Sequence, residues 1–330
     1  MEKVHKILGH EKEEALLARA ISFGRVFPTW IFYGPYGVGK ASIATRFAKC
    51  LLSNTISDGN TLDTLDICDD DVHKRVDMRT HPDFFVLEQT NESISIDDTR
   101  KLLAKVRKSP ALSRRRVVLL ENSSNLNKNI YNSLLKMLEE PPRDTVIIMI
   151  CNHLEIIPKT LLSRAMKICF HPLSEESVKQ ILDEMNISNS SKLSQLSEGS
   201  VGYALRLNAN NGVEIYENIL NGFRRNGSEY QKTLKWIIDN NLCENFDIIK
   251  FSILRILKIY VDMLSGTAIA DEKFSEEMKV LEPLVDASRA YPDSKIKKIQ
   301  EIIHLMGLCD HLILDRNAVV VNAFERFFKN

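Results

Sequence analysis

The chain has 330 residues, which is enough for two or three domains that each bury a core. It carries 44 basic and 44 acidic residues, so no global charge draws it onto nucleic acid or a membrane, and any contact with DNA requires a local patch. Its N-terminus has no apolar signal region. The most apolar stretch, 246–263, is interrupted by Lys250, Arg255 and Lys258 at helical spacing. We therefore expect a cytoplasmic protein that does not enter a membrane.

The segment 34–41, with the sequence GPYGVGKA, matches a phosphate-binding loop (P-loop, GxxxxGK[ST]) at every defined position except the last. An apolar run at 30–33 precedes it and a helical pattern follows it, which is the strand–loop–helix context of this motif. Backbone N–H groups and the helix dipole attract anions whatever the side chains are. The predicted nucleotide contacts are Gly34, Pro35, Gly37, Val38, Gly39, Lys40, Ala41 and Ser42.

Ala41 stands where the motif has the Ser or Thr whose hydroxyl holds Mg²⁺. Ser42 is a poor substitute, because the next residue of a helix points about 100° further around the axis. The metal offsets the charge that develops between the β- and γ-phosphates during hydrolysis. The loop is therefore expected to bind phosphate weakly, without supporting catalysis.

Apolar runs at 84–87, 117–120, 146–150 and 166–170 predict further strands. They alternate with helical patterns, one of which begins at Ser95 and runs to about 108. This alternation predicts a parallel sheet with helices on both faces. After Pro172 the pattern is helical, with the main segments at 174–185, 215–225, 230–240, 246–263, 296–308 and 318–328.

The strand 117–120 is followed by Glu121 and Asn122, where a P-loop NTPase carries acidic residues (Walker B). Glu121 could hold a metal, but Asn122 has no charge at the position of the residue that orients the attacking water. This second defect is independent of Ala41, so the two together argue against hydrolysis.

Ser163 and Arg164 lie in the connection between the last two strands. An arginine presented there to the nucleotide of a neighbouring subunit stabilises transition-state charge, with effects on the order of 10³–10⁵ in rate. A surface arginine is more commonly only solvated, so the motif carries weight only in combination with others.

The combination resembles the clamp-loader subunits of bacterial DNA polymerase III, which are AAA+ proteins. Residues 132–142 (NSLLKMLEEPP) look like the helix after Walker B in that family, and 81–84 (HPDF) match its HPD segment. Residues 7–10 (ILGH) with Gly24 and Arg25 match its N-terminal pattern, and Ser163 with Arg164 its SRC motif, in which Ala165 replaces the cysteine. The resemblance covers roughly the first 210 residues.

Within the family, motor subunits (gamma/tau) combine GKT or GKS, DE, SRC and a sensor-2 arginine. Here Gly202 takes the place of that arginine. Loss of the hydroxyl, the glutamate and the sensor-2 arginine, with Arg164 kept, resembles the delta-prime class. The resemblance then implies a non-hydrolysing stator that needs no cofactor and donates Arg164 to the adjacent motor subunit while the sliding clamp is loaded on primed DNA.

The implied partners are the gamma/tau and delta subunits, with primer-template DNA and the sliding clamp reached through the assembled complex. The implied architecture is an α/β AAA+ P-loop core at 1–171, a small helical lid at 172–210, and an all-α collar for oligomerisation at 211–330. An alternative is a self-sufficient ATPase, in which Glu121 holds the metal and Ser42 or water replaces the lost hydroxyl.

The family usually carries a four-cysteine zinc module after the P-loop helix, here near 50–80. Only Cys50 and Cys68 remain there, with His73 and His81 nearby, and no CxxC pair occurs among the six cysteines. We expect the zinc module to be absent or degenerate. Cys151 and Cys169, in strand-like runs, are expected to be buried as small apolar residues.

Basic residues gather on or just after the helix that begins at Ser95, and again before the strand at 117. In clamp loaders this helix faces the chamber through which DNA threads. Direct phosphate contact and a solvated helix face both explain the pattern. The residues are Arg100, Lys101, Lys105, Arg107, Lys108 and Arg114 to Arg116.

Overall fold

The computed structural model describes residues 8–53, 64–65, 70–87, 96–121, 128–224, 229–267, 275–309 and 314–328. The chain forms two compact units, Met1–Tyr203 (unit 1) and Ala204–Asn330 (unit 2). Each unit has its own core and is described by itself.

Unit 1 is built on a five-stranded sheet in the order β2-β3-β4-β1-β5, and every pair of neighbours is parallel. The strands are β1 (Thr29–Tyr33), β2 (Phe84–Leu87), β3 (Arg116–Leu120), β4 (Thr145–Cys151) and β5 (Met166–Cys169). All residues of β3 and β4 are buried, as expected of strands covered on both faces. The sequence prediction of a parallel sheet is confirmed.

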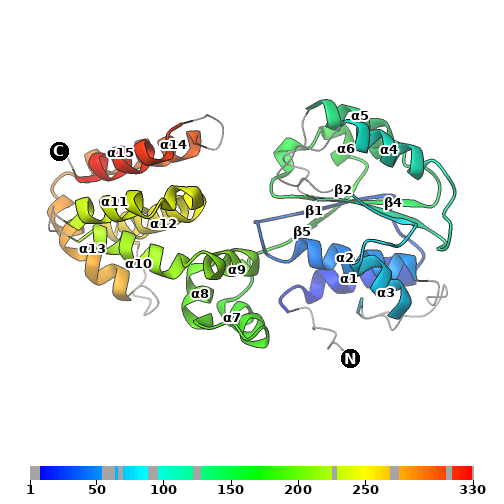
Figure 1. Cartoon of the computed structure of the whole chain (residues 1–330), viewed down its shortest axis with the longest axis horizontal. Helices are drawn as coiled ribbons and strands as arrows, with labels where there is room; N and C mark the ends of the chain where they lie inside the picture. Colours follow the sequence, from blue (N-terminus) through cyan, green and yellow to red (C-terminus); the bar gives the residue numbers. More distant parts are fainter. Residues whose placement is uncertain are drawn as a thin grey trace. The chain divides into compact units, whose positions relative to one another are not determined.

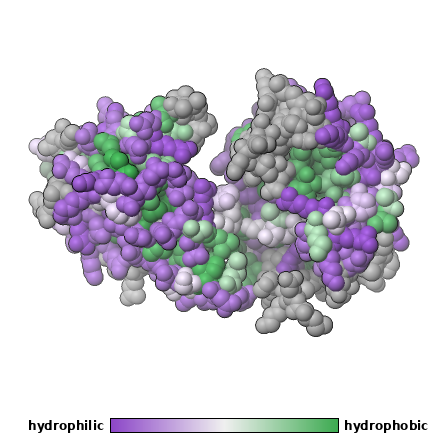
Figure 2. Space-filling view, in the orientation of Figure 1, coloured by the Kyte–Doolittle hydropathy of each residue, from purple (hydrophilic) through white to green (hydrophobic). Residues whose placement is uncertain are grey.

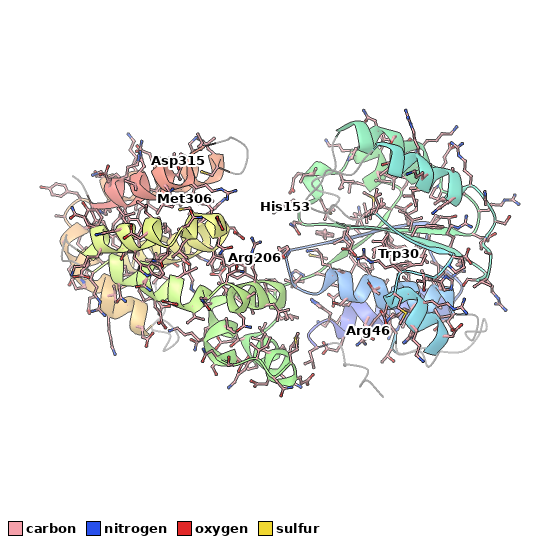
Figure 3. All side chains as sticks on the ribbon, viewed as in Figure 1. Trp30, Arg46, His153, Arg206, Met306 and Asp315 are labelled. Atoms are coloured by element: carbon pink, nitrogen blue, oxygen red, sulfur yellow. The ribbon has the colours of Figure 1, made fainter. Side chains whose placement is uncertain are left out.

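Helices cover both faces of this sheet (Figure 1). One layer holds α1 (Glu11–Ser22), α2 (Lys40–Leu52) and α3 (Asp70–Asp77), and the other holds α4 (Ile96–Val106), α5 (Lys128–Glu139) and the short α6 (Lys159–Leu162). Trp30 lies between the sheet and the first layer (Figure 3), where its ring packs edge-on against Phe47 with the centroids 5.2 Å apart. A short 3₁₀ helix, η2 (Leu154–Ile156), follows β4.

The sheet is followed by α7 (Glu175–Glu184), α8 (Ser190–Leu196) and α9 (Val201–Ala209). The Ser174 hydroxyl caps α7 by accepting a hydrogen bond from the backbone N–H of Ser177 at 3.1 Å. The boundary between the two units falls inside α9. We call residues 172–203 the α7–α9 segment.

Unit 2 is helical throughout its described residues, which confirms the predicted helical C-terminal region. Its elements are α10 (Gly212–Gly222), α11 (Glu229–Asp239), η3 (Leu242–Asn245), α12 (Phe246–Leu264), α13 (Ser275–Ser288), α14 (Pro292–Leu308) and α15 (Arg316–Phe328). Phe223, Tyr260, Phe324 and Phe327 pack as an aromatic cluster in its core.

Hydrophilic residues cover most of the visible surface of each unit, and hydrophobic residues show mainly between elements (Figure 2). None of the helices in the described part of the chain is long and apolar enough to cross a membrane.

Candidate phosphate-binding site

The P-loop leaves the carboxyl end of β1 and leads into α2, as the sequence predicted. Gly34 and Gly37 adopt φ of 143° and 72°, a region that favours glycine. A Cβ at Gly34 would lie 2.1 Å from the Phe170 carbonyl oxygen, and one at Gly37 would lie 2.4 Å from the Ser200 hydroxyl. Both positions therefore require glycine for conformation and for space.

Lys40 is buried and folds back onto its own loop. Its Nζ donates to the carbonyl oxygens of Gly34 at 2.6 Å and Pro35 at 2.5 Å, and to Oδ1 of Asn152 at 3.2 Å. Burial lowers the pKa of Lys40 to about 8, and the Cys151 thiol opposes this shift. The lysine therefore stays cationic at neutral pH, and three uncharged protein oxygens accept its hydrogen bonds in place of water.

Asn152 was missed by the sequence analysis. It directly follows β4, the neighbour of β1 in the sheet, so its side chain reaches the loop. The signal was present in the sequence: a polar residue at the carboxyl end of a fully apolar strand lies at the edge where parallel sheets bind ligands.

His10 fastens the N-terminal segment to the P-loop. The ring is buried, and its Nε2 lies 2.7 Å from the Val38 carbonyl oxygen, to which it donates. The ring also packs edge-on against Phe170, with the centroids 5.0 Å apart. The conformation of the loop is thus supported from outside the motif itself.

The α7–α9 segment touches the P-loop directly. The backbone N–H of Gly202 donates to the carbonyl oxygen of Gly37 at 2.9 Å, and the Ser200 hydroxyl donates to the Tyr36 carbonyl at 2.8 Å. A Cβ at Gly202 would lie 2.7 Å from the Cα of Gly37. The resemblance places a sensor-2 arginine at position 202, and here the absence of a side chain allows backbone to meet backbone.

The expected metal ligands are incomplete at this site. Ala41 and Ser42 are exposed in the first turn of α2, and only Ser42 carries a hydroxyl. Glu121 follows β3, is partly buried, and donates its backbone N–H to the Leu87 carbonyl at 3.0 Å. Asn122 lies outside the described residues. No cluster of three or more His, Cys, Asp or Glu side chains that could hold a metal occurs in the described part of the chain.

Arg164 is exposed, just after α6. Its Nη1 donates to the Thr160 carbonyl at 3.0 Å and lies 3.5 Å from the Ser163 hydroxyl, which itself donates to Thr160 at 2.8 Å. Ala165, which stands in the place of the family's cysteine, is buried in a hydrophobic core cluster of unit 1. The guanidinium therefore projects at the surface from a short helix whose last turn steadies it.

The HPD segment forms a buried ion pair. The Asp83 carboxylate accepts hydrogen bonds from the backbone N–H groups of Ala111, Leu112 and Ser113 at 2.7–2.9 Å, and lies 3.5 Å from Nη2 of Arg116. Burial acts to raise the pKa of Asp83, but the three amides and Arg116 outweigh it and lower that pKa below its usual value.

The sequence prediction that groups Arg116 with Arg114 and Arg115 as candidate DNA contacts is wrong for Arg116. Its side chain is buried, and its guanidinium donates to carbonyl oxygens at the end of α4, including those of Val106 at 2.9 Å and Ser109 at 2.8 Å. The sequence could not separate it from Arg114, which is exposed. Arg100, Lys101 and Lys105 are exposed on α4, and a role of theirs in DNA contact stays a prediction.

The structure describes three of the cysteines that the sequence analysis considered, Cys50, Cys151 and Cys169. Cys50 is buried and its Sγ donates to the Leu65 carbonyl at 3.2 Å, while Cys68 lies outside the described residues. Burial raises the pKa of Cys151 to about 11, as expected of an inert thiol, whereas Cys169 is only partly buried.

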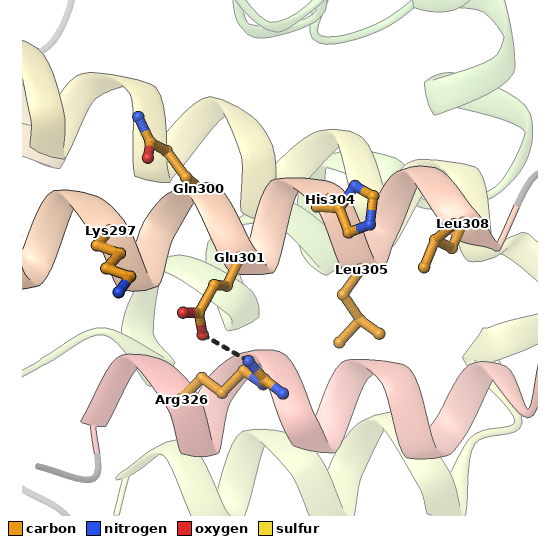
Figure 4. A pocket seen from close by; sticks show the side chains of 7 residues that line it. All are labelled: Lys297, Gln300, Glu301, His304, Leu305, Leu308 and Arg326. Atoms are coloured by element: carbon orange, nitrogen blue, oxygen red, sulfur yellow. Dashed lines mark hydrogen bonds and ion pairs between the residues drawn. The ribbon is translucent and has the colours of Figure 1, made fainter.

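A second hollow lies in unit 2, between α14 and α15 (Figure 4). It has a volume of about 520 Å³, and two of its lining residues, Arg326 and Glu301, form an ion pair of 2.6 Å. It contains none of the predicted site residues.

Comparison with known proteins places this geometry in a family. The family described as "DNA polymerase III, delta subunit" matches residues 9–174, half of the chain, and this match spans the P-loop, the HPD segment and Arg164. The chain belongs to the clamp-loader family of DNA polymerase III. The α/β core with a helical C-terminal region is also the fold of a gamma-subunit-related protein from Thermotoga maritima, with a TM-score of 0.50, 14% identity, and coverage of 94% of this chain and 97% of that chain.

Curated relatives of this clamp-loader chain include two subunit classes. It is 31% identical to the DNA polymerase III subunit tau of Escherichia coli over 61% of this chain and 32% of that protein. It is 34% identical to the subunit delta' of Pseudomonas aeruginosa over 42% of this chain and 41% of that protein. The match thus spans less than half of either relative.

Proposed function

We propose that this clamp-loader component is a non-hydrolysing subunit of the delta-prime class, whose chemistry is performed on the nucleotide of a neighbouring motor subunit. The observation that carries the proposal is the state of its own P-loop. Ala41 supplies no metal-binding hydroxyl, and the Lys40 ammonium is held by three protein oxygens. ATP or ADP then binds weakly, because its phosphates compete with those oxygens for the cation and lack Mg²⁺ support.

The Gly37–Gly202 contact supports the same proposal. A sensor-2 arginine extends from the lid onto a bound nucleotide, and glycine has no side chain that could do so. The lid backbone instead bonds to the P-loop itself, at 2.9 Å. The subunit then keeps one conformation whether or not nucleotide is present, which suits a stator.

Arg164 supplies the active role. Its exposed guanidinium, with Ser163 beside it, is free of any buried ion pair in the described part of the chain. Presented to a γ-phosphate held by the adjacent gamma/tau subunit, it stabilises the charge of the transition state. We propose residues 172–210 as the lid and 211–330 as the collar that joins the gamma/tau and delta subunits, with primer-template DNA and the sliding clamp engaged through the complex.

A second candidate is a hydrolysing subunit of the gamma/tau class. Two observations favour it. The match to the E. coli tau subunit covers 61% of this chain, against 42% for the delta' subunit of P. aeruginosa. The P-loop glycines also have the positive φ values that the loop requires. In that case Glu121 holds the metal, and Ser42 or water replaces the missing hydroxyl.

ATP turnover by the purified chain alone separates the two. The delta-prime proposal predicts no turnover above a buffer control with Mg²⁺ at saturating ATP. Appreciable hydrolysis that disappears in a Lys40→Ala variant would establish the gamma/tau reading and remove the stator proposal.

A further inference from the structure

A polar groove lies on the surface of unit 2, between α10 and α11. It has a volume of about 460 Å³. The residues on which the argument depends are Asn218, Asn221, Arg224, Lys232 and Trp236. Because the two helices follow one another in the chain and pack side by side, the end of α10 faces the start of α11. Arg224 and Trp236 therefore lie toward opposite ends of the groove.

A close approach of the two helices fixes the floor of the groove. The hydroxyl of the buried Thr233 donates to the Asn218 carbonyl at 3.1 Å. A Cβ at Gly222 would lie 2.9 Å from the same hydroxyl oxygen, so glycine gives α11 the room to approach α10. The groove is therefore a fixed feature of this helix pair.

One cation of the groove is left without a partner. Glu229 and Lys232 pair with each other at 2.8 Å. Arg224 is exposed, and its guanidinium forms no hydrogen bond or ion pair within the described part of the chain. Its planar fork of donors matches the two oxygens of a carboxylate. The groove thus offers one unpaired positive charge, at the end of α10.

Side-chain amides of α10 lie between the two ends of the groove. Nδ2 of Asn218 donates to the Glu214 carbonyl at 3.0 Å, and its Oδ1 remains to accept a hydrogen bond. Asn221 lies one turn closer to Arg224, is exposed, and has an amide without a hydrogen-bond partner among the described residues. An asparagine amide carries both a donor and an acceptor, which is the pair that a peptide group also presents.

Trp236 provides an apolar surface toward the other end of the groove. It is half-buried, and its ring has no aromatic contact in the part of the chain that the structure describes. A partly exposed tryptophan beside polar groups is a typical anchor of a binding surface. From Glu229 to Trp236 the helix rises about 10 Å, which an extended chain covers in about three residues.

We propose that this groove binds an extended, acidic peptide segment of a partner protein. Its carboxylate pairs with Arg224, a backbone peptide group pairs with Asn221, and an aromatic or apolar side chain about three positions away packs on Trp236. A nucleic-acid strand fits less well, because it presents a charge at every phosphate and the groove has a single unpaired cation. The site shares no residue with the P-loop or Arg164, so its failure would leave the delta-prime proposal standing.

Tryptophan fluorescence reports on this groove directly. The chain has two tryptophans, and Trp30 is completely buried in the core of unit 1. The full chain is titrated with two blocked tetrapeptides that carry aspartate at one end and phenylalanine at the other, in either order. At least one should give a saturable change in emission that is absent in Trp236→Phe. No saturable change with either peptide up to about 5 mM would overturn the proposal.

Variants that keep Trp236 separate the contacts. Arg224→Gln should weaken binding roughly tenfold, because it removes a charge-assisted hydrogen-bonded pair. Asn221→Asp should also weaken it, since it places a like charge beside the peptide. Lys235→Gln is the matched control: it removes the same charge from an exposed position of α11 outside the groove and should bind as wild type does. Thermal melting establishes that each variant is folded.

Changes in the ligand test its chemical class. A tetrapeptide with asparagine in place of aspartate should bind roughly tenfold more weakly to wild type and equally to Arg224→Gln. The proposal is overturned if Arg224→Gln and Lys235→Gln have equal effects or if the asparagine peptide binds wild type as well as the aspartate peptide does. It is also overturned if blocked aspartate alone binds as tightly as the tetrapeptide, or if an oligothymidylate changes the Trp236 emission at lower concentration.

Discussion

Gly37 and Gly202 meet backbone to backbone: the N–H of Gly202 donates to the Gly37 carbonyl at 2.9 Å, and a Cβ on Gly202 would lie 2.7 Å from the Cα of Gly37. This contact joins the P-loop to the first turn of α9, and it needs glycine on both sides. The two residues are far apart in the sequence, so the relationship appears only in the folded chain.

Gly202→Ala should lower the free energy of unfolding by about 1–3 kcal/mol, because the added methyl meets backbone atoms that cannot rotate away. Gly307→Ala is the matched control: Gly307 lies in α14 with open space around a built Cβ. That change should be neutral or stabilising by up to about 1 kcal/mol. Urea denaturation measures both, and equal effects of the two substitutions would argue that the Gly37–Gly202 contact is not tight.

Asp83→Asn should destabilise the chain by about 3–5 kcal/mol, because it leaves the buried Arg116 without its counter-charge. The folded pKa of Asp83 lies below its unfolded value, so its contribution is complete above about pH 4 and is lost as the pH falls toward the folded pKa. Wild type should therefore lose stability on acidification more steeply than Asp83→Asn. Asp77→Asn is the control: Asp77 is exposed and pairs with Lys49, so this change should lower the free energy of unfolding by less than about 1 kcal/mol.

Lys40 predicts that stability depends on pH in the alkaline range as well, with the same sign as for Asp83. Its folded pKa of about 8 is below the unfolded value of 10.5, so the unfolded chain binds more protons within that window. The stability of wild type relative to Lys40→Met should rise with pH across the window, by at most about 1.4 kcal/mol per pH unit. Paired denaturation curves at several pH values measure the difference. A difference that falls as the pH rises would show that the ammonium is stabilised in its site, contrary to the burial that lowers its pKa.

Ala41→Thr should restore a magnesium ligand without restoring hydrolysis. ATP affinity should increase roughly tenfold in Mg²⁺ and not in EDTA, since the gain comes from the metal. Turnover should stay absent, because Asn122 provides no carboxylate for the attacking water. Ser42→Ala tests the other hydroxyl of this turn: if Ser42 holds the metal, as the gamma/tau alternative requires, this variant should lose affinity in Mg²⁺ and not in EDTA. An equal gain in EDTA would show that the hydroxyl acts without metal.

Most of the sheet could be predicted because its strands are short, apolar and separated by helical patterns. β4 is buried along its whole length and appears in the sequence as the run TVIIMIC. α13 was harder to predict, because Pro283 lies within it and a proline in the interior of a sequence segment usually breaks or ends a helix. Its turns are held by packing against α12, which a local pattern does not reveal.

The candidate site was predictable where a motif is continuous and not where it depends on long-range contacts. Residues 34–41 and Arg164 were found because their spacing is local. The hydrogen bond from Lys40 to Asn152 joins the start of α2 to the residue after β4, and although Asn152 stands at the end of an apolar strand, nothing local in the sequence pairs it with Lys40. Arg116 was wrongly grouped with its basic neighbours in the sequence. Its buried partner, the Asp83 carboxylate, directly precedes β2 and is far from Arg116 along the chain.

The most direct test of the account is the ATPase of a clamp loader reconstituted with Arg164→Ala in this chain. The complex should assemble as wild type does, because Arg164 is exposed and bonds only to its own helix in the described part of the chain. Hydrolysis at the adjoining motor site should fall by roughly 10³-fold or more, and clamp loading should fall with it. Arg164→Lys should recover little, since an ammonium lacks the planar fork of donors, and Lys167→Ala on the exposed side of β5 should change nothing. An assembled Arg164→Ala complex that hydrolyses ATP at the wild-type rate would contradict the central claim.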